Sequence, residues 1–292
     1  MQKETNLIIT KLNKAEFQSF SILPHCKKLI IKEIDLISLP YLPNCEFLYA
    51  PNNRITILPP LPKCLYINVI NNKIEYLPEL PNCEILYVSV NKLKHIPILK
   101  QVVFLHISKN QLTEIPSLPL CKTIYATGNI IHTVYPLPEC TNLYIWKNHI
   151  THIDSYILPK IQVLNIAYNR LTHLPTFLSM TSCIAKHNKI ETIQSLSNCE
   201  YIDVSYNFLE SIENISSCKK LYISFNKPLH SLPDTPLLEY LSCSSELDID
   251  FEKSLDIVFE DEHFFQFEYK EEKEFDEGFP IQSDKYYITD IF

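Results

Sequence analysis

The side chains of this 292-residue chain that are best suited to metal binding or nucleophilic attack are its ten cysteines and ten histidines. Thiolates and imidazoles are common zinc ligands, and a thiolate is also a nucleophile. His152 and His173 share one register of the chain with His95, and His149 lies nearby. Eight cysteines share another register, at Cys26, Cys45, Cys64, Cys83, Cys121, Cys140, Cys199 and Cys218. The chemistry open to these groups depends on the elements that position them.

Glycine is nearly absent, since only Gly128 and Gly278 occur in the chain. A phosphate-binding P-loop, a dinucleotide-binding GxGxxG turn and a GxSxG nucleophile elbow each need closely spaced glycines. None of these sites can be built here, and no other pattern supports an active site. The sequence therefore predicts a protein that is not an enzyme and that carries no cofactor.

Asparagine reveals an internal repeat, with steps of 19 residues and a single step of 21. The repeated residues are Asn53, Asn72, Asn91, Asn110, Asn129, Asn148, Asn169, Asn188, Asn207 and Asn226. The segment Cys83–Pro97 shows the shared frame, with cysteine at position 1 and asparagine at position 9. Apolar side chains fall at positions 1, 4, 6, 11 and 14, and about twelve repeats can be counted.

This frame predicts a solenoid. Positions 4 and 6 alternate as in a short strand with one face inward, and positions 11 and 14 return the chain to the interior. Repeats stacked about 4.8 Å apart pair these strands in parallel and share one core, in which each buried Leu or Ile contributes roughly 1.5 to 3 kcal/mol. The asparagine amides at position 9 are expected to form a ladder that satisfies backbone groups of adjacent repeats.

Proline shapes the outer side of the predicted solenoid. Segments such as Leu39–Pro43, Leu58–Pro62 and Leu77–Pro81 fix φ near the polyproline value and exclude a helix. We therefore expect an extended convex side, with at most a helical or 3₁₀ turn in the 21-residue step around 154–160.

The LxxLxLxxNxL core with LPxLP spacers resembles the leucine-rich-repeat family over about residues 20–245. The proline-rich short repeat is similar to that of bacterial LPX effectors. Cysteine at position 1 and the bias toward Asn, Ile and Lys more closely resemble leucine-rich-repeat proteins of giant, mimivirus-like DNA viruses. The resemblance implies a horseshoe solenoid with a parallel sheet on its concave face, little α-helix, and protein binding by that face.

In this frame the eight cysteines form a column in the interior. Four thiols in a line at about 4.8 Å steps span about 14 Å and cannot surround one zinc ion. Neighbouring thiols come within disulfide range, although parallel directions and a core position argue against bridges. We predict reduced thiols that act as small hydrophobes, in a cytosol-like compartment. The histidines at position 13 lack a third ligand, so no metal site is predicted.

Positions 3, 5, 7 and 8 are expected to point away from the core along the concave face. They carry exposed aromatic side chains and lysines, which anchor interfaces because they bury large areas at low entropic cost. The same rings could instead stabilise the sheet through cross-strand contacts. The residues predicted to bind a protein partner are Tyr87, His106, Tyr125, Tyr144, Trp146, Lys147, Tyr168, Lys186, His187, Tyr206, Tyr222 and Phe225.

The sequence divides into an N-terminal cap (1–20), the solenoid (21–245) and an acidic, aromatic tail (246–292). The tail holds 16 acidic and 4 basic residues. It is expected either to cap the last repeat or to act as a docking segment that a partner displaces. The docking segment would lie across the concave-face lysines Lys109, Lys147, Lys186 and Lys220.

We therefore predict a monomeric, non-catalytic scaffold with a protein partner. One alternative is the substrate-recognition part of a ubiquitin-ligase-type effector, although no cysteine follows Cys243. A second is single-stranded nucleic-acid binding, which a net charge of −8 and the scarcity of arginine disfavour. No apolar run approaches the roughly 18 residues of a membrane span, and the N-terminus lacks an export signal. A cytoplasmic location is expected, in the host cell if the protein is viral.

Overall fold

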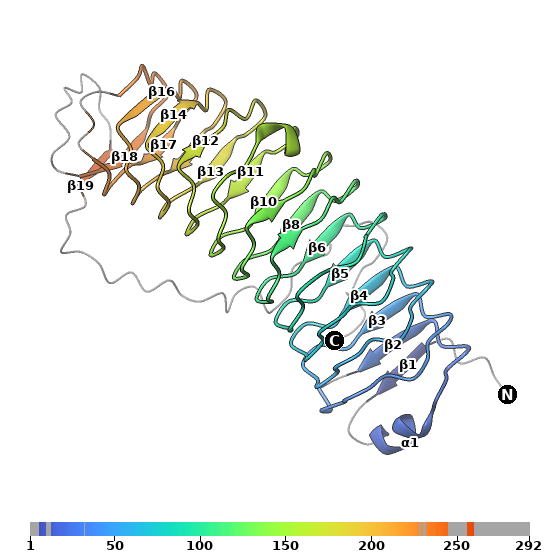
Figure 1. The fold of residues 1–292 in the computed structure, drawn as a ribbon. Helices are drawn as coiled ribbons and strands as arrows, with labels where there is room; N and C mark the ends of the chain where they lie inside the picture. The colour runs from blue at the N-terminus through green and yellow to red at the C-terminus, as the bar shows by residue number, and fades with distance from the viewer. Residues whose placement is uncertain are drawn as a thin grey trace. The chain divides into compact units, whose positions relative to one another are not determined.

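The computed structural model describes residues 6–9, 13–31, 33–227, 229, 232–244 and 256–259. Within the unit Met1–Glu260, these residues form a parallel β-solenoid of about twelve turns (Figure 1). The second unit, Asp261–Phe292, lies outside the described residues, as does most of the predicted tail.

One strand from each turn joins a 14-stranded sheet that follows the order of the chain (Figure 1). Every neighbouring pair is parallel, and equivalent positions face each other, as Leu86 faces Leu105. The strands are β1 (Asn6–Ile9), β2 (Lys28–Ile31), β3 (Phe47–Tyr49), β4 (Tyr66–Asn68), β5 (Ile85–Tyr87), β6 (Phe104–His106), β8 (Thr123–Tyr125), β10 (Asn142–Tyr144), β11 (Val163–Asn165), β13 (Ser182–Ile184), β15 (Tyr201–Asp203), β17 (Lys220–Tyr222), β18 (Tyr240–Cys243) and β19 (Asp256–Phe259). The sheet thus includes a strand within the predicted N-terminal cap and a strand within the predicted tail.

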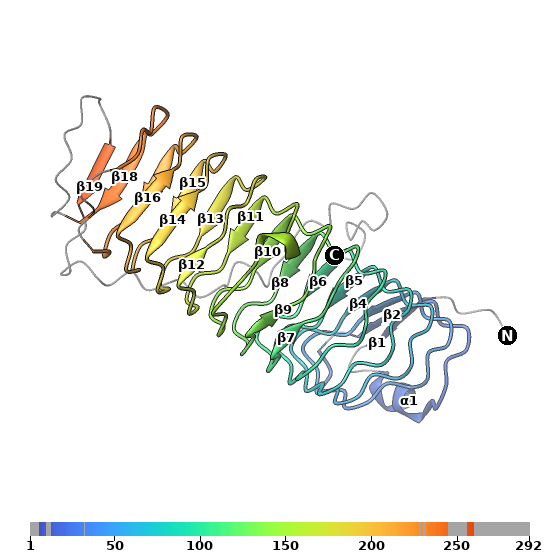
Figure 2. The same ribbon diagram turned by 45° about the horizontal axis from the view of Figure 1, so that its top comes forward.

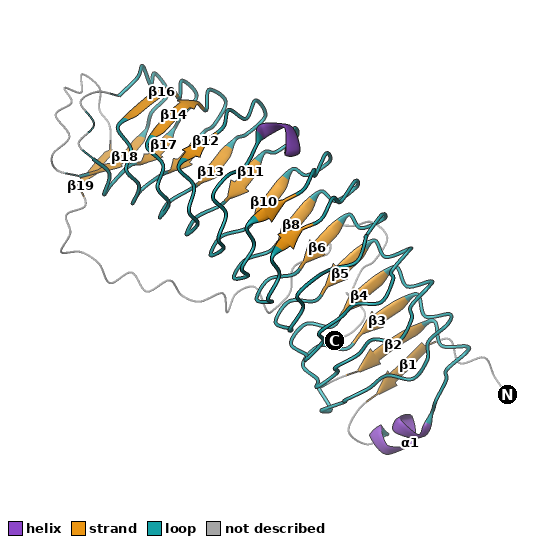
Figure 3. Ribbon diagram, in the orientation of Figure 1, coloured by secondary structure: helices purple, strands orange, loops and turns teal. Residues whose placement is uncertain are grey.

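Helix is scarce, as predicted. The described residues contain only α1 (Lys14–Ser19) and the 3₁₀ turn η1 (Ser155–Ile157), which lies in the 21-residue step (Figure 3). Neither is long enough to cross a membrane, and no helix among the described residues meets that requirement.

Short strands also form on a second side of the turns, where only extended chain was expected (Figure 2). They are β7 (Glu114–Ile115) with β9 (Thr133–Val134), and β12 (His173–Leu174) with β14 (Thr192–Ser195) and β16 (Ser211–Asn214). The spacers that contain β14 and β16 have no proline, so their N–H groups are available for pairing.

The residue before each ladder asparagine, at position 8, has a left-handed backbone with φ between 52° and 66°. These residues are Asn52, Asn71, Val90, Lys109, Gly128, Lys147, Tyr168, His187, Tyr206 and Phe225. The expectation that position 8 continues the strand face is therefore wrong, because the strand ends at position 5 and the chain turns at position 8. A turn of this kind favours glycine or asparagine.

Val90 is the β-branched member of this set, and a left-handed backbone costs such a residue about 1–2 kcal/mol. In the two preceding turns the position is asparagine, and Asn71 Nδ2 donates to Asn52 Oδ1 at 2.9 Å. An asparagine in place of Val90 can extend this amide row. We expect Val90→Asn to raise the free energy of unfolding by about 1 kcal/mol, measured by urea denaturation.

A matched control is Val103→Asn, since Val103 is 37% exposed against 38% for Val90 but does not have a left-handed backbone. We expect no stabilisation there. An equal gain at both positions would show that backbone strain at Val90 is not the cause.

Candidate interaction surface

The ladder asparagines fix the register of the sheet. Asn110 Nδ2 donates to the carbonyls of Ile107 in its own turn and Val88 in the preceding turn, each at 3.1 Å. Its Oδ1 accepts from the backbone N–H of Leu93 at 2.9 Å. In all ten asparagines the amide donates to backbone carbonyls and accepts from an N–H of the preceding turn. The end of each strand is thereby tied to the next turn.

Two rows of rings cover the open face and the adjoining turns of the sheet. The first ring row uses positions 3 and 5 and contains Phe47, Tyr66, Tyr87, Phe104, His106, Tyr125 and Tyr144. The second ring row contains Trp146 and the position 8 rings of Tyr168, His187, Tyr206 and Phe225. The first ring row extends to Tyr144, and the second extends from Trp146 of the same turn.

Within each row, rings from successive turns stack face to face at several steps. Phe47 and Tyr66 have ring centroids 4.4 Å apart and planes 6° apart, and Tyr125 and Tyr144 are 4.5 Å and 3° apart. In the second ring row, His187 and Tyr206 are 4.0 Å and 10° apart. Stacking of this kind removes ring faces from water and holds the side chains in place.

The predicted binding residues are therefore less exposed than expected. Only Lys147 is exposed, and the other eleven are half-buried because neighbouring side chains cover them. Tyr222 belongs to neither row and packs between Tyr201 and Tyr240. Position 3 lies on the same face as position 5, but its rings were not among the predicted binding residues: Phe47, Tyr66, Phe104, Tyr201 and Tyr240.

Burial displaces the pKa values of several rings in the two rows away from neutral pH. Burial, with a smaller effect of Lys109, lowers the pKa of His106 to about 4. Burial likewise lowers the pKa of His187, with Lys186 acting in the same direction. The pKa values of Tyr87 and Tyr125 rise to about 12, chiefly through burial. His106, Tyr87 and Tyr125 are consequently uncharged at neutral pH.

Two lysines lie beside rings of the second ring row. Lys147 Nζ lies 4.7 Å from the ring centroid of Trp146, a cation–π contact. Lys186 Nζ lies 3.4 Å from Asp203 Oδ2, and the buried Asp203 also accepts a hydrogen bond from Ser205 Oγ at 2.8 Å. The surface thus combines neutral rings with partly neutralised cations.

The cysteine column lies behind the sheet. All ten cysteines are buried and form no disulfide. The eight position 1 thiols donate to the position 3 carbonyl of their own turn. For example, Cys64 Sγ donates to the carbonyl of Tyr66 at 3.2 Å. These bonds were not predicted from the sequence. Burial is the main cause that raises the pKa to about 12 in Cys83, Cys140, Cys199 and Cys218. These thiols are therefore protonated at neutral pH.

The position 13 histidines lie away from the ring rows. The ring centroids of His152 and His173 are 4.9 Å apart, and His152 Nε2 lies 2.8 Å from Asp154 Oδ1. Across the described part of the chain, no three or more His, Cys, Asp or Glu residues are grouped so that they could hold a metal ion.

No protein-family model and no curated protein sequence matches the chain. Among solved structures, YopM from Yersinia enterocolitica has a TM-score of 0.67 and 27% identity, over 77% of this chain and 56% of that chain. YopM from Yersinia pestis, a leucine-rich effector protein, has a TM-score of 0.65 and 27% identity, over 87% of this chain and 82% of that chain. The functional domain of InlJ from Listeria monocytogenes, which includes a cysteine ladder, has a TM-score of 0.53 and 22% identity, over 62% of this chain and 44% of that chain. The chain thus spans little more than half of the Yersinia enterocolitica protein, and its architecture is that of a leucine-rich-repeat solenoid.

Proposed function

We propose that the chain is a non-catalytic scaffold that binds a protein partner across the open face of its 14-stranded sheet. The observation that carries this proposal is the pair of stacked ring rows on a sheet whose register the asparagine ladder fixes. Rings that are already immobilised lose little entropy when a partner covers them, so more of the contact energy appears as affinity. Solved structures of this fold are typically protein-interaction scaffolds, which agrees with the proposal.

The stacking also bears on the chemistry of the partner. Where rings such as His187 and Tyr206 cover each other's faces, a partner meets ring edges. Ring edges carry the positive part of the aromatic quadrupole and attract carbonyl or carboxylate oxygens. Single-stranded nucleic acid binds such surfaces by stacking bases on free ring faces. A polypeptide surface therefore suits this face better than single-stranded nucleic acid.

The finer parts of the proposal rest on sequence resemblance. The resemblance to giant-virus repeat proteins supports action in the cytoplasm of a host cell, as a monomer. The buried thiols are compatible with a reducing compartment of that kind. A ubiquitin-ligase-type effector is the alternative that the bacterial resemblance offers, but no feature of the described residues favours it.

The test compares the native chain with a Tyr144→Ala, Trp146→Ala, Lys147→Ala triple variant in affinity capture from cell lysate. A protein captured by the native chain is then purified, and its dissociation constant is measured against both. We expect the triple variant to bind at least about tenfold more weakly, because large aromatic and basic side chains dominate interface energies.

A matched control is Ile57→Ala, Tyr76→Ala, which removes two side chains that are 72% and 70% exposed on a different side of the turns. We expect its affinity to stay within about twofold of the native value. Unchanged binding by the triple variant, or an equal loss in the control, would refute the sheet face as the binding surface.

A further inference from the structure

The residue after each ladder asparagine, at position 10, forms an exposed column of its own. In the nine turns from Arg54 to Phe208, its backbone N–H donates to the position 11 carbonyl of the preceding turn. Lys73 donates to Ile55 at 2.9 Å and Arg170 to Ile150 at 2.8 Å. These bonds place successive position 10 residues directly beside one another. The column contains Arg54, Lys73, Lys92, Gln111, Ile130, His149, Arg170, Lys189, Phe208 and Lys227.

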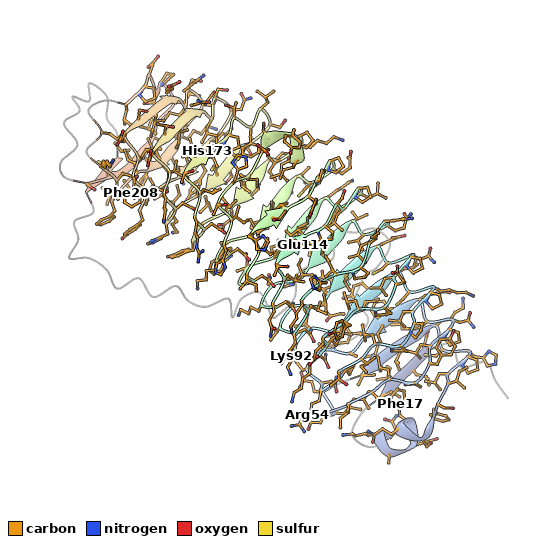
Figure 4. The ribbon with its side chains drawn as sticks, viewed as in Figure 1. Phe17, Arg54, Lys92, Glu114, His173 and Phe208 are labelled. Carbon is orange, nitrogen blue, oxygen red and sulfur yellow. The ribbon has the colours of Figure 1, made fainter. Side chains whose placement is uncertain are left out.

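Positions 8 and 10 lie on either side of the buried asparagine, and we refer to them together, over residues 52–227, as the rim. Figure 4 labels three of its members, Arg54, Lys92 and Phe208. The rim contains no aspartate or glutamate, although the whole chain has a net charge of −8. Its cations include both arginines of the chain and are Arg54, Lys73, Lys92, Lys109, Lys147, Arg170, Lys189 and Lys227.

Much of this charge is not neutralised locally. Lys92 pairs with Glu75 at 3.9 Å, and Lys227 pairs with Glu210. The other four position 10 cations, Arg54, Lys73, Arg170 and Lys189, form no ion pair with any residue that the structure describes. Turns about 4.8 Å apart lie within the Debye length of about 8 Å at physiological salt, so the potentials of adjacent cations add.

We propose that the rim binds an extended acidic segment of a partner polypeptide. Arginine forms bidentate hydrogen bonds with carboxylates, and flexible Asp or Glu side chains can adapt to cations repeated at the spacing of the turns. The rim shares its position 8 residues from Lys147 onward with the sheet-face site, but its position 10 cations belong to the rim alone and are not among the residues assigned to the sheet face.

Nucleic acid fits the rim less well. The position 8 rings of the second ring row stack on one another, so they offer few free faces for bases. A duplex that extends beyond the rim would also meet the repulsion of a chain with a net charge of −8. A short acidic segment interacts with the local positive charge of the rim alone.

The test measures fluorescence anisotropy of a labelled peptide of about twelve glutamates against the full chain in about 50 mM NaCl. The rim variant is Arg54→Gln, Lys73→Gln, Arg170→Gln, Lys189→Gln. The control removes the same charge from exposed lysines near the starts of the strands: Lys63→Gln, Lys100→Gln, Lys122→Gln, Lys160→Gln. We expect the rim variant to bind about tenfold more weakly and the control to stay within about twofold. About 300 mM NaCl should weaken binding by the native chain.

Circular dichroism and urea denaturation of each variant establish that the fold is intact. If the quadruple variant fails to fold, the double variant Arg170→Gln, Lys189→Gln replaces it, with an expected loss of about threefold. Absence of saturable peptide binding by the native chain, or an equal loss in rim and control variants, would overturn the proposal. A random-sequence DNA duplex that binds more tightly than the peptide with the same dependence on the rim would overturn it too. The rim variant keeps all twelve sheet-face residues, so either proposal can fail without the other.

Discussion

Raising the pH from 8 to 10 is expected to lower the free energy of unfolding by about 5 kcal/mol through four buried thiols alone. Burial raises the pKa of Cys83, Cys140, Cys199 and Cys218 from 9.0 to about 12. Between these values the native state holds protons that the unfolded chain releases, so stability falls as pH rises. Full stability is present below about pH 8, where the thiols are protonated in both states.

The size of this effect is comparable with the whole stability of a typical domain, which is about 5–15 kcal/mol. At pH 10 each thiol lowers the free energy of unfolding by about 1.4 kcal/mol, because the pH is then about one unit above the pKa of the unfolded thiol. Cys64, Cys121 and Cys183 also have raised pKa values and add to the loss. Cys45 acts in the opposite direction, because a hydrogen bond with Cys64 lowers its pKa.

Urea denaturation, followed by circular dichroism at pH 8, 9 and 10, measures how steeply the free energy of unfolding falls with pH. The control replaces the four cysteines with valine, which position 1 already accommodates at the fully buried Val102. We expect the stability of this variant to depend much less on pH, with a residual decline from the buried tyrosines. A native chain whose stability is flat up to pH 10, or a variant with the native slope, would contradict the assignment.

The fold could be predicted because one turn repeats many times. Positions 4 and 6, such as the fully buried Leu86 and Val88, had to face inward in every repeat for the pattern to persist. The 21-residue step correctly located η1, because two extra residues must be accommodated within one turn. The short strands β14 and β16 were missed, since their pairing depends on two adjacent spacers that both lack proline.

The candidate site was less predictable. The period placed Tyr125 and Tyr144 in adjacent turns, but whether their rings stack or project freely depends on side-chain rotamers that no frame position specifies. Position 8 was predicted to lie on the strand face with positions 3, 5 and 7, and residues such as Tyr206 and Phe225 are typical of strands. Their left-handed φ values of 56° and 59° arise from the closure of the turn before the ladder asparagine.

Replacing Asn148 with alanine is expected to lower the free energy of unfolding by about 3–5 kcal/mol. Asn148 is 5% exposed, and its Nδ2 donates to the carbonyls of Ala126 and Ile145, each at 3.0 Å. Its Oδ1 accepts from the N–H of Ile131 at 3.0 Å. Alanine leaves the N–H of Ile131 without this acceptor, and a buried group left unpaired costs about 1–3 kcal/mol. The two carbonyls keep the amides of Asn129 and Asn169 as donors but each loses one hydrogen bond, worth about 0.5–1.5 kcal/mol. Urea denaturation at neutral pH measures the loss.

Two further variants separate the hydrogen bonds from the volume of the side chain. The exposed Asn82 donates to the carbonyl of Pro62 alone, so Asn82→Ala should cost less than about 1 kcal/mol. Asn148→Asp keeps an acceptor for the N–H of Ile131 but directs a carboxylate oxygen at two carbonyl oxygens. At neutral pH, Asn148→Asp should destabilise the chain as much as Asn148→Ala or more. The destabilisation should lessen as the pH falls, because repulsion by the carbonyl oxygens raises the pKa of the Asp carboxyl in the folded state and a protonated carboxyl can donate. If Asn148→Ala and Asn82→Ala cost the same, or if acid does not relieve Asn148→Asp, the amide bonds between turns do not stabilise the solenoid.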